Sequence, residues 1–176
     1  MKESVELPGG VQATFVDGLL SVKGPKGEAT RLISVPGLII SVQDKSVVLE
    51  TKESTKRDKK LLYTFVAHLK NLCKGVTEGH RYVLRICSGH FPMNVAMKGQ
   101  VFEVKNFLGE KVPRVATLPQ GVQVKIDAKD VIVEGCDLEK TAQAAATIEQ
   151  LTKRVGFDRR IYQDGIYIIE KDGNPL

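Results

Sequence analysis

Gly37-Leu38-Ile39-Ile40-Ser41-Val42 and Gly121-Val122-Gln123-Val124-Lys125-Ile126 are two versions of one pattern, an apolar strand-like segment that begins at a glycine. Each is followed by a short turn, by a second apolar segment at residues 45–48 or 129–132, and then by a helical pattern. When strand, turn, strand and helix recur in the same order, they indicate an internal repeat. We therefore predict that the chain contains two copies of one unit.

Another pair of segments is more similar letter by letter: Leu7-Pro8-Gly9-Gly10-Val11-Gln12 and Leu118-Pro119-Gln120-Gly121-Val122-Gln123. Aligning these two would set an early hairpin against a late one and leave the two helices out of phase. The first alignment also brings the preceding hairpins together, residues 18–23 with 99–105, so we prefer it. It divides the chain near Gly79.

The first copy is expected to hold several strands followed by one helix. Asp17-Gly18 between two apolar runs is a strong hairpin signal. Thr55 and Asp58 have the spacing of a capping box that begins the helix, and Gly75 is expected to end it. The expected strands cover residues 11–16, 19–24, 28–34, 38–42 and 46–50.

The second copy repeats this plan. A helix is expected from about residue 138 to 154, with Asp137 as its N-cap, followed by a closing hairpin that turns at Gln163-Asp164-Gly165. The sequence thus predicts an α+β fold, a tandem duplication of a small domain in which each copy is a mainly antiparallel sheet packed with one helix. The domains are residues 1–79 and 80–176. The expected strands of the second copy cover residues 81–87, 94–97, 101–104, 112–118, 122–127, 131–135, 161–162 and 166–170.

Composition narrows the class of protein. With 42% hydrophobic and 27% charged residues, the 176-residue chain is globular rather than disordered. It lacks an apolar run of ~18 residues, a signal-peptide start and paired cysteines, so we expect a soluble intracellular protein without a membrane partner. The net charge of +5 mildly favours a polyanionic partner. Because residues 1–79 carry 12 basic and 9 acidic groups and residues 80–176 carry 14 and 12, a binding face must come from local clustering.

Signals for catalysis are weak. The three histidines do not have metal-binding spacing, and the sequence contains no phosphate-binding loop motif. Cys87 and His90 are the one pair that would suit nucleophilic chemistry, and both fall at an expected strand end. We therefore expect no enzyme activity, cofactor, metal or small-molecule substrate.

Basic residues gather in three places. The second helix carries a polar stripe that includes Lys140 and Gln143, residues 153–162 hold four cations and two aromatics, and the loop 105–114 holds three cations around Phe107. Arginine forks match phosphate oxygens and aromatic rings can stack on unpaired bases. From its pattern alone the stripe favours a solvated face over a packed core, and Phe107 could equally belong to the core. The expected phosphate contacts are Lys111, Arg114, Lys140, Lys153, Arg154, Arg159 and Arg160, with Phe107 or Tyr162 as base or sugar contacts.

Four segments, in this order along nearly the whole chain, resemble the universal L-six family of large-subunit ribosomal proteins. Leu7-Pro8-Gly9-Gly10-Val11 is similar to the family's start, and Lys74-Gly75-Val76-Thr77-Glu78-Gly79 to the end of its first domain. Asn106-Phe107-Leu108-Gly109-Glu110-Lys111 and Asp164-Gly165-Ile166-Tyr167 resemble its archaeal and eukaryotic branch. The bacterial branch has a Tyr-Lys-Gly-Lys-Gly type segment near its end, which this chain lacks, so contacts of that segment are not carried over.

The resemblance implies a non-enzymatic ribosomal protein in the cytoplasm. Its expected partners are the large-subunit rRNA, bound mainly by the second domain, neighbouring ribosomal proteins, and translation factors that dock nearby. It adds the loop Asn106 to Lys111, together with Asp158, Arg160 and the segment Tyr162 to Tyr167, to the expected RNA-contacting residues. An alternative function is a protein-binding scaffold that uses the sheet of the first domain.

Overall fold

The structure is a computed structural model that describes residues 1–43, 45–158 and 160–176. The chain divides into two compact units. The first unit comprises residues 1–79 and 136–138, and the second comprises residues 80–135 and 139–176. Neighbouring strands of every described sheet run antiparallel.

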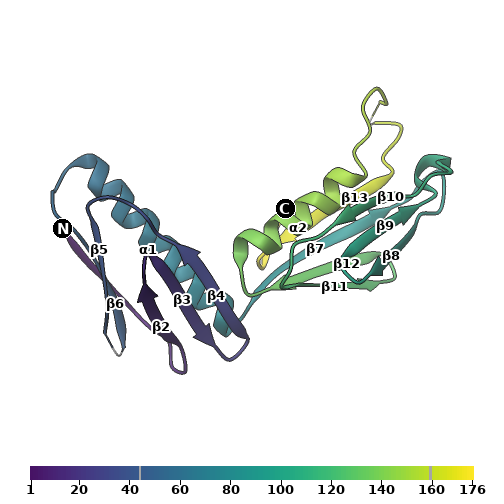
Figure 1. The fold of residues 1–176 in the computed structure, drawn as a ribbon. Coiled ribbons are helices and arrows are strands. Elements are labelled where there is room, and N and C mark those ends of the chain that lie inside the picture. The colour runs from purple at the N-terminus through teal and green to yellow at the C-terminus, as the bar shows by residue number, and fades with distance from the viewer. Residues whose placement is uncertain (44, 159) are drawn as a thin grey trace. The chain divides into compact units, whose positions relative to one another are not determined.

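The first unit has two three-stranded sheets packed with one long helix, α1 (Lys56–Thr77), as Figure 1 shows. Helix α1 contacts strands of both sheets, and Leu62, Leu69 and Val76 on it are buried in the shared core. One sheet has the order β1 (Lys2–Glu6), β6 (Ser46–Thr51), β5 (Leu38–Gln43), and the other the order β2 (Gln12–Val16), β3 (Leu19–Gly24), β4 (Gly27–Leu32).

Both ends of α1 follow from local hydrogen bonding. The predicted capping box is confirmed, because the Thr55 hydroxyl accepts from the Asp58 backbone N–H at 3.2 Å and the Asp58 carboxylate accepts from the Thr55 N–H at 3.3 Å. The prediction that Gly75 ends the helix is wrong. A glycine inside a helix costs only about 1 kcal/mol, and the chain leaves the helix at Gly79, whose φ of +79° favours glycine. The N–H groups of Glu78 and Gly79 both donate to the Lys74 carbonyl there.

The second unit has a three-stranded sheet, a five-stranded sheet and helix α2 (Leu138–Leu151). In Figure 1, α2 runs along the sheet that contains β7 and β13. Its buried residues are Thr141, Ala144, Ala145 and Ile148. The smaller sheet has the order β10 (Arg114–Thr117), β9 (Val101–Lys105), β8 (Asn94–Lys98). The larger has the order β11 (Val122–Asp127), β12 (Asp130–Gly135), β7 (His80–Cys87), β13 (Gly165–Lys171), β14 (Asn174–Pro175).

The two units share one topology. The order β1-β6-β5 of the first unit recurs as β7-β12-β11, and β2-β3-β4 recurs as β8-β9-β10. The hairpins that precede the two helices therefore correspond as the preferred alignment predicted, and the fold class of a duplicated α+β domain is confirmed. Strands β13 and β14 have no counterpart in the first unit.

Two boundaries in the second unit differ from the predictions. Helix α2 ends at Leu151, not near residue 154, because Thr152 and Lys153 donate to carbonyls three residues back and tighten the last turn. Val155 lies beyond this end of the helix and is 89% exposed. Strand β10 of the three-stranded sheet, expected from residue 112, begins only at Arg114, after Pro113.

The closing hairpin was predicted at the wrong place. Residues 161–162 form no strand, and β13 instead begins at Gly165, pairs with β7, and turns back into β14 at Asp172 and Gly173. Both turn residues have positive φ, 49° and 86°. Asp164 is not part of a hairpin turn, and its carboxylate instead binds the loop that contains Gly89 and His90.

Candidate nucleic-acid interface

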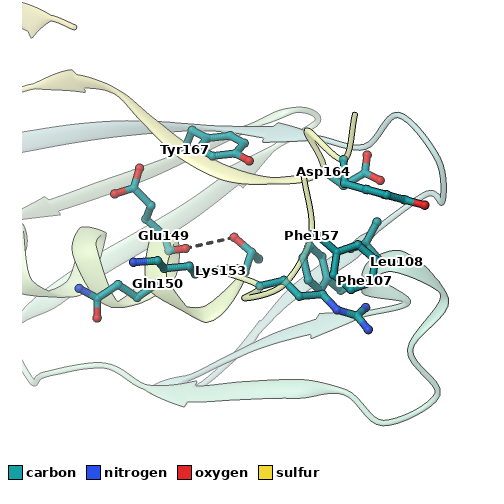
Figure 2. A pocket seen from close by; sticks show the side chains of 11 residues that line it. Phe107, Leu108, Glu149, Gln150, Lys153, Phe157, Asp164 and Tyr167 are labelled. Atoms are coloured by element: carbon teal, nitrogen blue, oxygen red, sulfur yellow. Dashed lines mark hydrogen bonds between the residues drawn. The ribbon is translucent and has the colours of Figure 1, made fainter. Parts of the chain in front are cut away.

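A pocket of about 340 Å³ lies in the second unit, where the end of α2 meets the loop after β9 and the segment before β13. In Figure 2, Gln150 and Lys153 lie on one side of the pocket, and Phe157, Phe107 and Leu108 on the other. The structure thus brings together residues from all three predicted basic clusters, because Gln150 of the polar stripe on α2 lines the same pocket as Phe107 and Lys153. The pocket is lined by Phe107, Leu108, Glu149, Gln150, Thr152, Lys153, Arg154, Phe157, Tyr162, Asp164 and Tyr167.

The loop 106–110 is held in a tight conformation beside this pocket. Asn106 has left-handed backbone angles (φ 60°, ψ 32°), and its side-chain Nδ2 donates to the Pro92 carbonyl at 3.0 Å. Phe107 is only 1% exposed. The Phe107 ring therefore belongs to the core, the alternative that the sequence left open, and a base or sugar contact by Phe107 stays a prediction. Asn106 has a structural contact, and its role in RNA binding stays a prediction.

Arg114 is held by groups of the protein itself. Its guanidinium donates to both Glu110 carboxylate oxygens at 2.8 Å, and to the carbonyls of Leu151 at 2.8 Å and Lys153 at 3.2 Å. It also lies over the Phe107 ring, 4.4 Å from the centroid. These bonds connect the loop to the end of α2, so Arg114 positions the rim of the pocket. Phosphate contact by Arg114 remains untested.

Glu110 forms ion pairs with two arginines. Arg154 lies 3.5 Å from the carboxylate oxygen that also accepts from Arg114. The hydrogen bond from Arg114 lowers the pKa of Glu110 and, with the charges of Arg114 and Arg154, outweighs the opposing effect of burial. The carboxylate therefore stays ionised and holds both cations at the pocket.

Aromatic rings form the exposed wall of the pocket. The Arg154 guanidinium lies 4.1 Å from the centroid of Phe157, whose ring meets that of Tyr162 edge-on at 4.9 Å. The Tyr162 ring in turn lies 5.0 Å from the His90 ring, tilted by 30°. Phe157 and Tyr162 are each 38% exposed. Phe157 was within the basic segment that the sequence singled out, but its contact with Arg154 was not predicted.

Asp164 anchors the segment that carries Tyr162. Its buried carboxylate accepts from the Gly89 N–H, from the His90 N–H at 3.2 Å, and faces His90 Nδ1 at 2.9 Å. Burial raises the pKa of Asp164, but these hydrogen bonds and the charge of His90 together outweigh burial and leave the pKa below its usual value. Sequence reasoning treated Asp164 as a turn residue, because nothing local signals a partner 74 positions away.

The remaining predicted cations are spread around the pocket. Lys111 and Lys153 are exposed, and Arg160 is 90% exposed while its guanidinium pairs with Asp158 at 2.8 Å. Lys140 and Gln143 are exposed on α2, and Lys140 stands ten residues from Gln150, about 15 Å along the helix axis. The pocket therefore does not include Lys140, Gln143 or Lys111. Arg159 lies outside the described residues.

Other kinds of site have little support in the described part of the chain. No cluster of three or more histidine, cysteine or acidic side chains that could hold a metal is found among the described residues. All three cysteines are free thiols, and His90, the proposed partner of Cys87, binds Asp164. Within the same residues, no helix has the length and apolar character needed to cross a membrane.

Comparison with known proteins identifies the family. The family described as Ribosomal protein L6 matches residues 7–79 and 91–165, which is one match in each unit. The chain is 46% identical over 172 residues to the large ribosomal subunit protein uL6 of Aeropyrum pernix, covering 97% of this chain and 94% of the relative. It is 45% identical over 173 residues to that of Ignicoccus hospitalis (96% and 93%) and 42% identical over 168 residues to that of Methanosarcina mazei (96% and 96%). The resemblance seen in the sequence is confirmed, and the chain belongs to the ribosomal protein L6 family.

Proposed function

We propose that this protein is a structural component of the large ribosomal subunit that binds large-subunit rRNA mainly through its second unit. The observation that carries the proposal is the division of the cations around the pocket. Arg114 is bound internally and fixes the rim, whereas Lys111, Lys153 and Arg160 extend into solvent from the same region. A pocket rim of fixed geometry that carries exposed cations suits a folded RNA, whose phosphates also have fixed positions.

The physical mechanism requires no chemical step. Folded RNA presents phosphates, 2′-hydroxyls and shape, because its deep major groove hides the base edges. Each phosphate neutralised by a lysine or arginine releases counterions, which supplies much of the affinity. The contacts between Asp164 and the 88–90 loop and between Arg114 and α2 hold the backbone segments that carry the cations, so little backbone freedom is lost when RNA binds.

The direct test is incorporation into particles. A tagged full-length protein should co-sediment with large subunits and stay there through a high-salt wash, together with neighbouring ribosomal proteins. A variant with Lys111, Lys153 and Arg160 all changed to alanine should wash off at lower salt. Release of both proteins at the same salt concentration would contradict the assigned RNA face.

Proximity to the translation-factor site is the finer part of the proposal. It is supported by family membership and by the match of residues 91–165 in the RNA-binding unit. If it is correct, chemical crosslinking of actively translating ribosomes should join lysines of the second unit, such as Lys111, to a bound GTPase factor. Crosslinks confined to rRNA and to distant ribosomal proteins would argue against it.

A second candidate function, binding a protein partner, concerns the first unit. Val16, Leu19 and Leu32 are opposite one another on β2, β3 and β4, and are 65%, 43% and 69% exposed. An exposed row of three aliphatic side chains on one sheet suits a protein neighbour better than RNA. Changing all three to serine should release a neighbouring ribosomal protein from the particle while rRNA binding remains.

A further inference from the structure

The pocket in the second unit has the size of a small-ligand site. Its volume of about 340 Å³ is near the lower end of the ~300–1,000 Å³ typical of ligand pockets. The open space is bounded by exposed aromatic surface of Phe157 and Tyr162 and by the cations Lys153 and Arg154. Figure 2 shows Lys153 and Phe157 on opposite sides of this space. A flat ring with a nearby anionic group would satisfy both kinds of surface.

The aromatic wall is held in place before any ligand arrives. Arg154 packs on Phe157, Phe157 packs on Tyr162, and Tyr162 packs on His90, whose ring is fixed by the buried Asp164. Rigid aromatic surfaces stack on bases at a low entropic cost, and such stacking is tolerant of sequence. Because Phe157 remains 38% exposed with Arg154 on it, part of the ring is available for contact.

Two polar side chains of the pocket, Thr152 and Glu149, are used in internal hydrogen bonds, whereas the Gln150 amide can recognise a ligand. The Thr152 hydroxyl accepts from Ile166 N–H at 2.9 Å and donates to the Glu149 carbonyl, while the Glu149 carboxylate accepts from Ile168 N–H at 3.0 Å. These groups are therefore committed to the packing of α2 on β13. Gln150 is exposed at the pocket, and its amide has both donors and an acceptor for a base edge.

We propose that this pocket receives the base of one unpaired rRNA nucleotide, with the ring against Phe157 and Tyr162, the base edge toward Gln150, and the phosphate toward Lys153 and Arg154. This inference rests on the proposed function and deepens it. A paired nucleotide does not fit the role, because its base is stacked within a helix and its edge is occupied. The site thus holds a nucleotide that the rRNA fold extrudes.

The test uses large subunits assembled with the full-length protein. Irradiation at 254 nm followed by digestion and mass spectrometry should yield a peptide with a single nucleotide attached at Phe157 or Tyr162. Phe91, which is 47% exposed and does not line the pocket, is the internal control for random crosslinking. Dimethyl sulfate probing of the same particles should show one base that is protected with the wild-type protein and reactive with Phe157→Ala.

Measuring the rRNA affinity of variants tests the size of the stacking contribution. Loss of one stacked base corresponds to a decrease in rRNA affinity of about 5- to 150-fold for Phe157→Ala, whereas Ile161→Ala, on the same segment and 62% exposed, should change it less than twofold. Phe157→Leu keeps apolar volume but no ring, and should behave like the alanine variant if stacking is the cause.

Each outcome separates this inference from the proposed function. If the protein enters the particle and lysine variants weaken it, but Phe157→Ala changes neither affinity nor base reactivity and no crosslink forms, the pocket inference is overturned and rRNA binding stands. If the protein does not bind large subunits at all, both fail. Tight, saturable binding of adenosine 5′-monophosphate to the free protein, without a crosslink in particles, would assign the pocket to a free nucleotide and overturn the inference as well.

Discussion

Replacing Arg114 by alanine should weaken the second unit's folding far more than its charge alone suggests. The change removes two hydrogen bonds to the Glu110 carboxylate at 2.8 Å and two to the carbonyls of Leu151 and Lys153. Among the described residues, it leaves Arg154 as the remaining ion-pair partner of Glu110. Hydrogen bonds to charged groups contribute about 1.5–3 kcal/mol each when buried, and exposed ion pairs contribute about 0.2–1 kcal/mol.

Arg114 is 23% and Glu110 28% exposed, so solvent reduces these contributions and water can reach the freed carbonyls. We expect a loss of about 2–3 kcal/mol in the free energy of unfolding, intermediate between the exposed and buried cases. For a unit of this size, such a loss lowers the melting temperature by roughly 10–20 °C.

Thermal and urea unfolding followed by circular dichroism measure this effect, with Lys111→Ala as the matched control. Lys111 is an exposed cation of the same loop, and its replacement should change stability by less than about 0.5 kcal/mol. If Arg114→Ala and Lys111→Ala are equally stable, the internal hydrogen bonds do not fix the loop, and the assignment of Arg114 as a positioning residue is wrong.

Three further predictions concern Asp164, Arg160 and Gly79. Asp164→Asn should lower the free energy of unfolding by about 2 kcal/mol at neutral pH, because the 88–90 loop loses the charged carboxylate that accepts its hydrogen bonds. Because the folded-state pKa of Asp164 is lowered, its stabilisation is present above the usual carboxyl range and disappears as the pH falls through the lowered pKa, so wild type and Asp164→Asn should converge in acid. Arg160→Ala breaks only a solvent-exposed pair with Asp158, and should leave the melting temperature nearly unchanged while lowering rRNA affinity. Gly79→Ala should destabilise the first unit, because the left-handed φ of +79° that closes α1 strains an alanine, and urea unfolding should show a lower midpoint.

The parts of the fold that could be predicted from sequence depend on local signals. The hairpins 38–43/46–51 and 122–127/130–135 are bounded by short turns and filled with apolar residues, so their positions followed from pattern. The capping box at Thr55 needs only residues three apart. Strand β1 was missed because Val5 is the one buried residue in a segment that is otherwise charged or polar.

The parts that could not be predicted depend on partners distant in the chain. Arg114 looked like a free cation until its bonds to the end of α2, 37 positions away, were seen. Asp164 looked like a turn residue because its hydrogen-bond partners are in the 88–90 loop. Phe107 follows a left-handed asparagine that turns its ring into the core, which neither charge nor hydropathy of the loop reveals. The basic and aromatic residues that gather in the second unit were thus readable from the sequence, but the division between structural and exposed cations was not.

That division is tested most directly by the salt dependence of rRNA binding. The logarithm of the binding constant should fall linearly with the logarithm of salt concentration, and each lost phosphate contact should make the slope shallower by about 1. The account predicts a slope shallower by about 2 for the double variant Lys111→Ala, Lys153→Ala, with folding stability unchanged. A double variant with the wild-type slope would show that these exposed lysines do not meet the RNA backbone, and would contradict the account.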